Sequence, residues 1–260
     1  MRRFYRVLTA LGSVRAQRNL GWATLLGLIA TTVIALAVVP ADASQGDVQR
    51  LMYVHVPAAW VAYLSFGVVF VASVAYLRTG RIHWDRIAVS SAEIGVVFCA
   101  LTIVLGSLWG RPVWGTWWTW DPRLTTTALL LLIYLGYLLL RRVADSPARR
   151  ARWSAVVGVV GFVDVPIVHM SVVWWRSLHQ EATVIRPGAP TIAGSMLLTL
   201  LFAFVVFSVA YGYLMTARLR VGRLEERGSV PVSTPRARRP RPDRQQVAAA
   251  AAPTGGAVDA

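Results

Sequence analysis

Long apolar runs separated by short polar segments dominate the chain. A transmembrane helix needs about 20 predominantly apolar residues, and six runs meet or approach that length. They span residues 20–39, 57–77, 87–109, 124–140, 153–175 and 192–215. The pattern therefore predicts an all-α integral membrane protein with six transmembrane helices. The first run starts too far along the chain, and is too long, for a cleavable signal peptide, so we expect it to be retained.

The positions of the arginines predict which side of the membrane each loop faces. Of the 27 arginines, 22 lie in the N-terminal segment, the second and fourth loops and the C-terminal tail, and the other three loops share five. Cytoplasmic segments carry an excess of basic residues. We therefore expect both termini to be cytoplasmic, and the loops after the first, third and fifth runs to face outward.

The predicted organisation has three parts. Residues 1–19 form a cytoplasmic N-terminal segment, residues 20–217 a six-helix membrane domain, and residues 218–260 a cytoplasmic tail. From about Gly228 the tail is rich in Arg and Pro and then in Ala and Gly, with no run of large apolar residues that could pack a core. Such a composition predicts disorder. The tail arginines could contact anionic lipid head groups, although a solvated tail without a further role is the simpler interpretation.

Composition narrows the classes of function. The chain has 260 residues, of which 56% are apolar, with a net charge of +15 and a mean hydropathy of +0.53. A disordered chain or a soluble nucleic-acid-binding protein would be less apolar. All basic residues are Arg, so a Walker A phosphate loop and a Schiff base to pyridoxal phosphate or retinal are excluded. The single cysteine, Cys99, excludes an internal disulfide and a Cys-rich metal site.

A tryptophan-rich loop at residues 109–125 lies on the predicted outward side. It reads W-G-R-P-V-W-G-T-W-W-T-W-D-P-R-L-T. Trp114, Trp117 and Trp118 have the i, i+3, i+4 spacing of one helix face, which predicts a continuous aromatic surface. An interfacial aromatic belt is the alternative. Five tryptophans in one loop are more than a belt requires, and they favour a platform for a flat aromatic ligand.

Asp121 followed by Pro122 predicts the start of the fourth helix. An Asp side chain accepts hydrogen bonds from the free N–H groups of a first helical turn, and Pro fits the first helical position. Outward arginines near this point could pair with carboxylates of a ligand, although each could equally face solvent or lipid phosphate. These residues are Arg111, Arg123, Arg176 and Arg186.

Two histidines flank the tryptophan-rich loop on the predicted outward side. His55 precedes Pro57, which we expect in the first turn of the second helix, so His55 should lie just outside that helix. His179 follows the fifth run in W-W-R-S-L-H-Q. Neutral imidazole is a common metal ligand, and a haem iron offers two axial positions. Zinc would need three or four ligands at close spacing, and no H-x-x-x-H or H-E-x-x-H motif occurs.

Two acidic residues lie within the predicted spans. Glu93 stands in S-S-A-E-I-G, and Asp164 stands two residues before Pro166, which interrupts helical hydrogen bonding. Ionisable groups inside a membrane are costly and by default indicate function. Hydrogen bonding between helices explains them equally well, so both interpretations stay open and neither residue belongs to the predicted site.

Four motifs together resemble one family. W-G-T-W-W-T-W-D-P-R-L-T closely resembles the WWD signature of the haem-handling proteins of cytochrome c maturation. Y-V-H-V-P-A-A-W, V-P-I-V-H-M-S-V-V-W-W and W-W-R-S-L-H-Q narrow the resemblance to the six-span haem exporter protein C (CcmC) family, over about residues 15–220. The sequence departs from the family pattern at Pro122, where small residues are more usual, and at Glu93, where an apolar residue or Pro is expected.

The resemblance implies a ligand, partners and a site. CcmC-like proteins hold haem b at the outer face of the cytoplasmic (inner) membrane and present it to the haem chaperone CcmE. The ABC transporter complex of CcmA and CcmB and the small membrane protein CcmD are further partners. By motif position, the axial ligands of the haem iron are His55 and His179, not His169. The platform comprises Trp114, Trp117, Trp118, Trp120 and Asp121.

The leading hypothesis is a non-catalytic protein that binds and transfers haem during cytochrome c biogenesis, with no role for nucleic acid. One alternative is a cytochrome c synthase that attaches haem directly to apocytochrome, although such relatives are larger and have a big outward domain. A second is a permease that translocates haem, but the distinctive residues gather at one face instead of a midplane path. A b-type electron-transfer cytochrome would place paired histidines inside helices, facing each other across the bundle.

Overall fold

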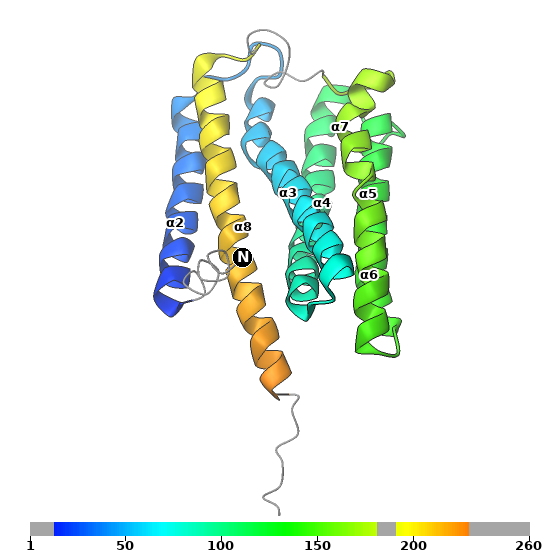
Figure 1. Cartoon of the computed structure of the whole chain (residues 1–260). Helices are drawn as coiled ribbons and strands as arrows, with labels where there is room; N and C mark the ends of the chain where they lie inside the picture. Colours follow the sequence, from blue (N-terminus) through cyan, green and yellow to red (C-terminus); the bar gives the residue numbers. More distant parts are fainter. Residues whose placement is uncertain (1–12, 181–190, 229–260) are drawn as a thin grey trace, which may run out of the picture. The chain divides into compact units, whose positions relative to one another are not determined.

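The computed structural model describes residues 13–180 and 191–228 (Figure 1). Within these ranges six helical segments are long and apolar enough to cross a membrane, which confirms the predicted all-α, multi-pass membrane architecture. They are Val14–Val38, Asp47–Thr79, Ile82–Trp114, Pro122–Val143, Pro147–Trp174 and Gly194–Glu225. Of the described residues, those up to Arg223 belong to one compact unit, and the last residues of the final helix, from Leu224, fall outside it.

The spans comprise nine helical elements in the described part of the chain. In order these are α2 (Val14–Val33), the π-helical turn η1 (Ile34–Val38), the 3₁₀ turn η2 (Asp47–Leu51), α3 (Met52–Thr79), α4 (Ile82–Trp114), α5 (Pro122–Val143), α6 (Pro147–Gly161), α7 (Asp164–Trp174) and α8 (Gly194–Gly228). Successive spans run in opposite directions. The connections after η1 and α4 therefore share one end of the bundle, and those after α3 and α5 share the other (Figure 1).

Helix bounds differ from the predicted ones at several ends. Helix α8 continues to Gly228, so the first residues of the predicted tail, from 218, are helical. Helix α2 begins at Val14, inside the predicted N-terminal segment. The rest of both segments, residues 1–12 and 229–260, lies outside the described residues.

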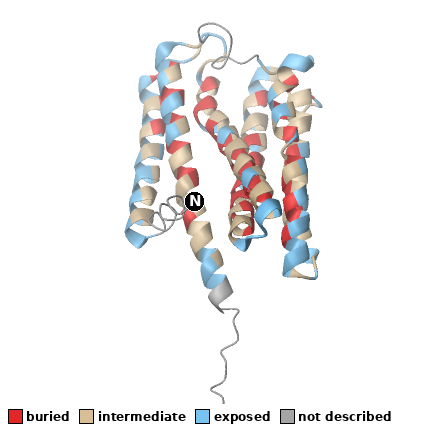
Figure 2. Cartoon of the chain, viewed as in Figure 1, coloured by how far each residue is buried: buried red, intermediate tan, exposed pale blue. Residues whose placement is uncertain are grey.

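Helices α3 to α7 surround the largest buried apolar cluster. Its centre is the stack of Phe66 on Tyr134, with ring centroids 3.7 Å apart. Small residues allow close packing, as is common between membrane helices. A Cβ at Gly95 would lie only 2.6 Å from the Phe66 ring, and one at Gly158 would lie 2.6 Å from Ser73 Oγ. Figure 2 shows that buried positions are frequent on α3 and α4 and sparse on α2.

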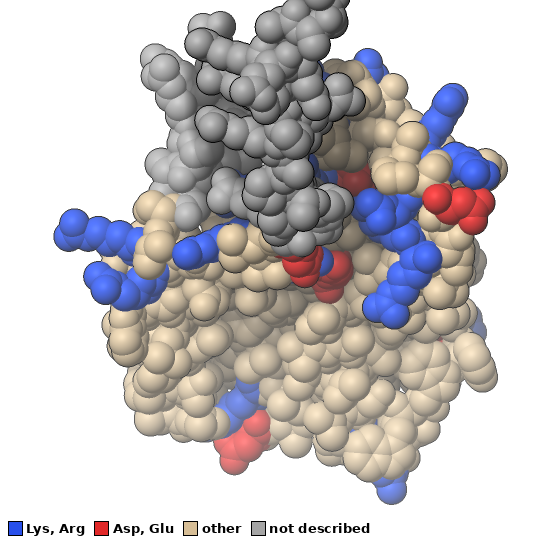
Figure 3. All heavy atoms as spheres, turned by 90° about the horizontal axis from the view of Figure 1, so that it is seen from below, with Lys and Arg blue, Asp and Glu red and all other residues tan. Residues whose placement is uncertain are grey.

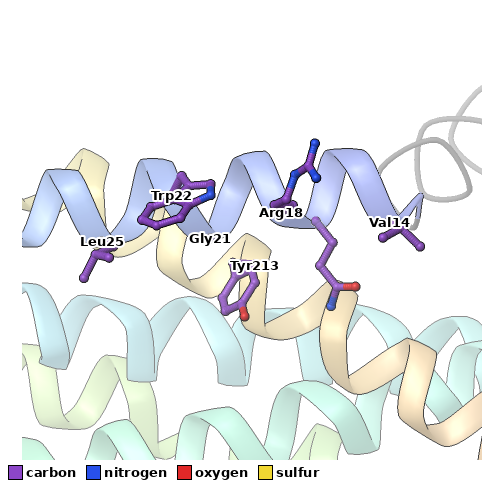
Figure 4. A pocket seen from close by; sticks show the side chains of 7 residues that line it. Val14, Arg18, Gly21, Trp22, Leu25 and Tyr213 are labelled. Carbon is purple, nitrogen blue, oxygen red and sulfur yellow. The ribbon is translucent and has the colours of Figure 1, made fainter.

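Helix α2 packs on α8. Gly27 approaches Val206, and Gly21 approaches the Tyr213 ring, so a side chain at either glycine would crowd its neighbour. A groove of about 460 Å³ lies beside this contact, near the start of α2 (Figure 4). Arg18 and Trp22 contribute to its lining. The groove therefore lies at the end of α2 remote from the tryptophan-rich loop.

Two ion pairs connect helices of the bundle, one buried and one partly exposed. Arg141 of α5 donates two hydrogen bonds, of 2.6 and 2.8 Å, to the Asp85 carboxylate of α4, and both side chains are at most 10% exposed. Arg218 of α8 binds Glu93 of α4, with one N–O distance of 3.1 Å. Glu93, one of the two acidic residues left open by the sequence, therefore has an interhelical partner.

Arginine side chains surround the end of the bundle viewed in Figure 3. This end carries the start of α2 and the α3–α4 and α5–α6 connections, as the sequence pattern requires. Arginines near these points include Arg15, Arg18, Arg78, Arg81, Arg142, Arg149, Arg150 and Arg152. The positive-inside rule favours this basic end as the cytoplasmic one, and the orientation remains a prediction.

We expect Asp85→Asn to lower the unfolding free energy by roughly 3 kcal/mol, because it leaves the Arg141 charge buried without a counter-ion. Thermal unfolding in detergent micelles would measure the loss. Asp145→Asn is the matched control, since its ion pair with Arg149 is exposed on both sides and should contribute almost nothing. Equal effects of the two substitutions would contradict the prediction.

Candidate functional site

Gly115 ends α4 directly after Trp114. Its φ of 77° is left-handed, and its N–H donates a 3.0 Å hydrogen bond to the Arg111 carbonyl, as is typical of a glycine helix terminus. Trp117 and Trp118 consequently lie in an irregular segment beyond the helix. The predicted helical face of Trp114, Trp117 and Trp118 is therefore wrong, because its spacing argument assumed a helix that the left-handed Gly115 ends.

Asp121 lies between this irregular segment and α5, and it begins α5 as the sequence predicts. Its Oδ1 accepts a 2.9 Å hydrogen bond from the Arg123 N–H in the first turn. The same carboxylate binds the segment after α7: the Leu178 N–H donates to Oδ2 at 2.7 Å, and the Ser177 hydroxyl donates to Oδ1 at 3.1 Å. The residue is only 6% exposed, so this carboxylate joins two loops at one end of the bundle.

His179 is the fourth partner of Asp121, with Nδ1 3.3 Å from Oδ1. Burial raises the pKa of the Asp121 carboxyl, but backbone and hydroxyl donors outweigh burial and hold that pKa below its ordinary value. For His179, burial and the positive charge of Arg123 outweigh the attraction of Asp121 and lower the pKa to about 4. A carboxylate can only accept. A neutral His179 therefore carries its proton on Nδ1, which leaves the lone pair of Nε2 free for a ligand.

His55 lies inside a helix, which corrects the expectation that it precedes one. Helix α3 begins at Met52, preceded directly by the 3₁₀ turn η2, and Pro57 stands within it. The His55 ring packs edge-on against Trp109, with centroids 5.6 Å apart. The Thr102 backbone of α4 hydrogen-bonds the ring, and Nδ1 is buried close to Gly106 of the same helix. A histidine ring has two nitrogens, so one is left for a ligand.

The two histidines lie close together. Their imidazoles are near enough to interact electrostatically, and the Arg123 guanidinium acts on both. Arg123 also donates a 3.1 Å hydrogen bond to the carbonyl of His169, whose side chain is exposed. Trp114 packs edge-on against His179, with ring centroids 4.7 Å apart.

The remaining loop tryptophans face outward from this pair. Trp117 is 57% and Trp120 is 79% exposed, and Trp118 packs edge-on against Trp120 at 5.7 Å. The Arg111 guanidinium lies 6.0 Å from the Trp117 ring. The predicted aromatic residues therefore divide into Trp114, which supports a histidine, and Trp117, Trp118 and Trp120, of which Trp117 and Trp120 are exposed and Trp118 is half-buried.

Sequence reasoning missed several residues that build the site. Trp109 supports His55, and a Cβ at Gly106 would lie 3.1 Å from His55 Cε1. Ser177 holds both ends of the Asp121–His179 contact, because its hydroxyl donates to Asp121 and accepts from the His179 N–H. The only available signals were the position of Trp109 inside the tryptophan-rich loop and that of Ser177 two residues before His179.

The donor set suits haem better than a bare metal ion. Within residues 13–180 and 191–228, no group of three or more His, Cys, Asp or Glu could hold a metal ion. Structural and catalytic zinc sites need at least three protein ligands. A haem iron takes four ligands from its porphyrin, so one ring nitrogen from each of two histidines could complete its coordination.

Residues 3–232 match the family model described as Heme exporter protein C, CcmC. The chain belongs to the CcmC family. The family assignment covers all six spans, the tryptophan-rich loop and both candidate histidines.

Individual relatives agree with this assignment. Heme exporter protein C of Bradyrhizobium diazoefficiens is 41% identical over 200 residues, which cover 74% of this chain and 76% of that protein. Heme exporter protein C of Haemophilus influenzae is 38% identical over 205 residues, or 78% of this chain and 82% of that protein. The Escherichia coli K12 Heme exporter protein C is 38% identical over 175 residues, covering 65% and 69%.

We expect Asp121→Ala to release the segment that carries His179. Amide exchange at Leu178, followed by hydrogen–deuterium exchange mass spectrometry, should accelerate by roughly tenfold or more, because a charge-assisted hydrogen bond is lost. Asp42→Ala is the matched control, since Asp42 accepts comparable hydrogen bonds from Ser44 and Gln45 in a separate loop. Unchanged exchange at Leu178 in the Asp121 variant would show that the carboxylate does not hold this segment.

Proposed function

We propose that the chain binds haem b at the outer face of the cytoplasmic membrane and passes it to a CcmE-like haem chaperone during cytochrome c maturation. The observation that carries the proposal is that the imidazoles of His55 and His179 lie close to each other, each with one ring nitrogen that could bind iron. The names of the CcmC relatives, which describe haem exporters, support the ligand class. The role is that of a transport and assembly factor and not of an enzyme.

Asp121 prepares His179 for iron. A ligating histidine usually donates its second ring N–H to a carboxylate or carbonyl, which fixes the ring and makes the ligating nitrogen more basic. The 3.3 Å contact between His179 Nδ1 and Asp121 supplies this arrangement. On the other side, the Thr102 backbone hydrogen-bonds the His55 ring. Haem would supply the iron, which the remaining nitrogen of each ring would bind.

The exposed tryptophans offer a surface for the porphyrin or for the chaperone that receives it. Trp117, Trp118 and Trp120 present flat apolar faces beside the histidine pair, and stacked π-surfaces bind planar partners. Arg123 interacts with both histidines and could pair with a haem propionate. Arg176 is exposed and could do the same, whereas Arg186 lies outside the described residues.

We also propose which side of the membrane the site faces and which proteins assemble with the chain. The basic end of the bundle is cytoplasmic by the positive-inside rule, so the site faces outward in the cytoplasmic (inner) membrane. The partners are a CcmA/CcmB-like ABC complex, a CcmD-like small membrane protein and the lipid bilayer. The irregular segment from Gly115 to Trp120 is short, which favours handing haem to a chaperone over enclosing an apocytochrome.

Replacing His55 and His179 together by Ala should remove bound haem, because the iron loses both protein ligands. The Soret absorbance of protein purified from a haem-replete host would measure this loss. His169→Ala is the control, since its side chain is exposed and lies outside the predicted ligand pair. Asp121→Asn should weaken haem binding by roughly 10- to 100-fold, the usual cost of losing such an oriented partner. A Soret band that survives the double substitution would refute haem ligation by this pair.

Replacing Trp117 and Trp120 by Ala should reduce the amount of haem-loaded chaperone that co-purifies with the protein. The reason is the loss of the most exposed aromatic area beside the site. Trp153→Ala is the control, because Trp153 is 60% exposed but lies in α6 near the basic end. Equal chaperone recovery from both variants would argue against a docking role for the loop. Holocytochrome made without any chaperone would favour the synthase alternative.

A further inference from the structure

The first loop of the bundle, residues 39–46 between η1 and η2, contacts the side of the site that carries His55. Its Gln45 reaches across to α4, because the Trp109 indole N–H donates a 2.8 Å hydrogen bond to Gln45 Oε1. The Trp109 ring in turn packs against the His55 imidazole, with centroids 5.6 Å apart and ring planes at 87°. Two direct contacts therefore connect Gln45 to a candidate haem ligand.

Hydrogen bonds within the first loop fix the backbone at Gln45. The Asp42 carboxylate accepts from the N–H groups of Ser44 and Gln45, at 2.9 Å each. Asp42 and Gly46 exchange two backbone hydrogen bonds, of 3.2 and 2.9 Å. Gly46 has a φ of 59°, a left-handed conformation that glycine adopts without strain. The loop therefore presents the Gln45 side chain from a defined backbone.

Arg50, in the 3₁₀ turn η2, fastens the same loop to the end of the first span. Its guanidinium donates a 3.0 Å hydrogen bond to the Val39 carbonyl and another to the Ala35 carbonyl. Its Nε also lies 2.8 Å from the Asp47 carboxylate. Carbonyls at the end of a helix lack helical partners, so these bonds satisfy groups that need donors. The loop is thus held independently of the Gln45 side chain.

Three residues of α4 contact the His55 ring, at positions four and three apart, which is the spacing of one helix face. The Thr102 backbone hydrogen-bonds the ring. Gly106 lies so close that a Cβ there would be 3.1 Å from His55 Cε1. These two contacts are made by the main chain of α4. The third, from Trp109, is made by a side chain that can rotate unless another group holds it.

Fastening the loop to α4 is the alternative role for the contact between Gln45 and Trp109. The loop already has the Arg50 bonds, and Trp109 packs with an apolar cluster that includes Val39 and Met52. One further neutral hydrogen bond adds little to such an anchor. A half-buried indole N–H does need an acceptor, and the position of that acceptor selects the orientation of the ring. Orientation of Trp109 is therefore the larger effect of Gln45.

We propose that Gln45 is a positioning residue for the candidate haem ligand His55. By accepting the Trp109 N–H, it holds the indole against the imidazole and so keeps the imidazole in one orientation. Partners outside the ligand shell that orient a ligating histidine strengthen metal binding. Asp121 orients His179 directly, whereas Gln45 orients His55 through an indole. This inference rests on the proposed haem-binding function, but the orientation of His55 is measurable without haem.

Histidine-selective NMR of the full-length, haem-free protein in detergent micelles tests the positioning step. The chain has four histidines, and loss of a signal in His55→Ala assigns the His55 ring. Gln45→Leu should shift that signal, because the field of an aromatic ring at a neighbouring proton depends on their relative orientation. Gln45→Glu keeps an acceptor oxygen and should preserve the wild-type position. An unmoved signal in Gln45→Leu, or an equal shift in Gln45→Glu, would overturn the proposal.

Gln17→Leu is the matched control. Gln17 Oε1 accepts a 3.1 Å hydrogen bond from Arg220 near the basic end of the bundle. The same substitution there removes a comparable acceptor that is remote from His55. Neither the His55 signal nor the affinity for haem should change in this variant, and a shift equal to that of Gln45→Leu would argue against a specific role for Gln45.

Haem titration separates this proposal from the proposed function. Gln45→Leu should weaken haem binding by roughly tenfold, the low end of the effect of losing an orienting partner, and Gln45→Glu should restore it. Equal affinity of the wild type and Gln45→Leu would overturn the role of Gln45 toward haem. Wild-type protein that binds no haem would instead refute the proposed function, while the His55 signal still decides whether Gln45 orients the ring.

Discussion

The Asp121 carboxylate is the interaction on which the site depends. It accepts hydrogen bonds from the start of α5 and from residues 56 to 58 positions further along the chain. Besides the edge-on contact with Trp114, the Asp121 carboxylate is what holds His179 to the rest of the site. A single side chain thus begins a transmembrane helix and selects the tautomer of a candidate ligand. The buried hydrogen bonds also explain why the acid is ionised in this setting.

The bilayer imposes the second constraint, because polar groups in hydrocarbon must find partners within the protein. Most of the chain meets this demand by continuous helices, and two internal charges meet it by pairing with arginines. Exceptions among the described residues include the buried Oδ2 of Asp164 and the hydroxyls of Ser73 and Tyr134. Buried polar groups without a protein partner therefore indicate a bound ligand or water. Without such a partner, an apolar side chain at the same position would cost less free energy to bury.

Sequence patterns predicted the six spans and the start of α5, because span length and helix capping are local properties. They failed where a nearby residue or turn changed the backbone, or where residues far apart in sequence came into contact. Gly115 takes a left-handed conformation, which ends α4 before Trp117 and breaks the expected aromatic face. The 3₁₀ turn η2 leads directly into α3, so Pro57 does not mark the helix start. The contact between Asp121 and Ser177 joins positions far apart in sequence, and no spacing rule reaches it.

The two candidate ligands are supported in different ways, and this difference suits a protein that must release what it binds. His55 belongs to a transmembrane helix and packs against Trp109 and Gly106 of α4. His179 belongs to a non-helical segment held chiefly by one carboxylate. Moving His55 would require distorting two packed helices, whereas moving His179 requires only the exchange of a few hydrogen bonds. Under the proposed function, the His179 side of the haem is therefore the side that opens for transfer.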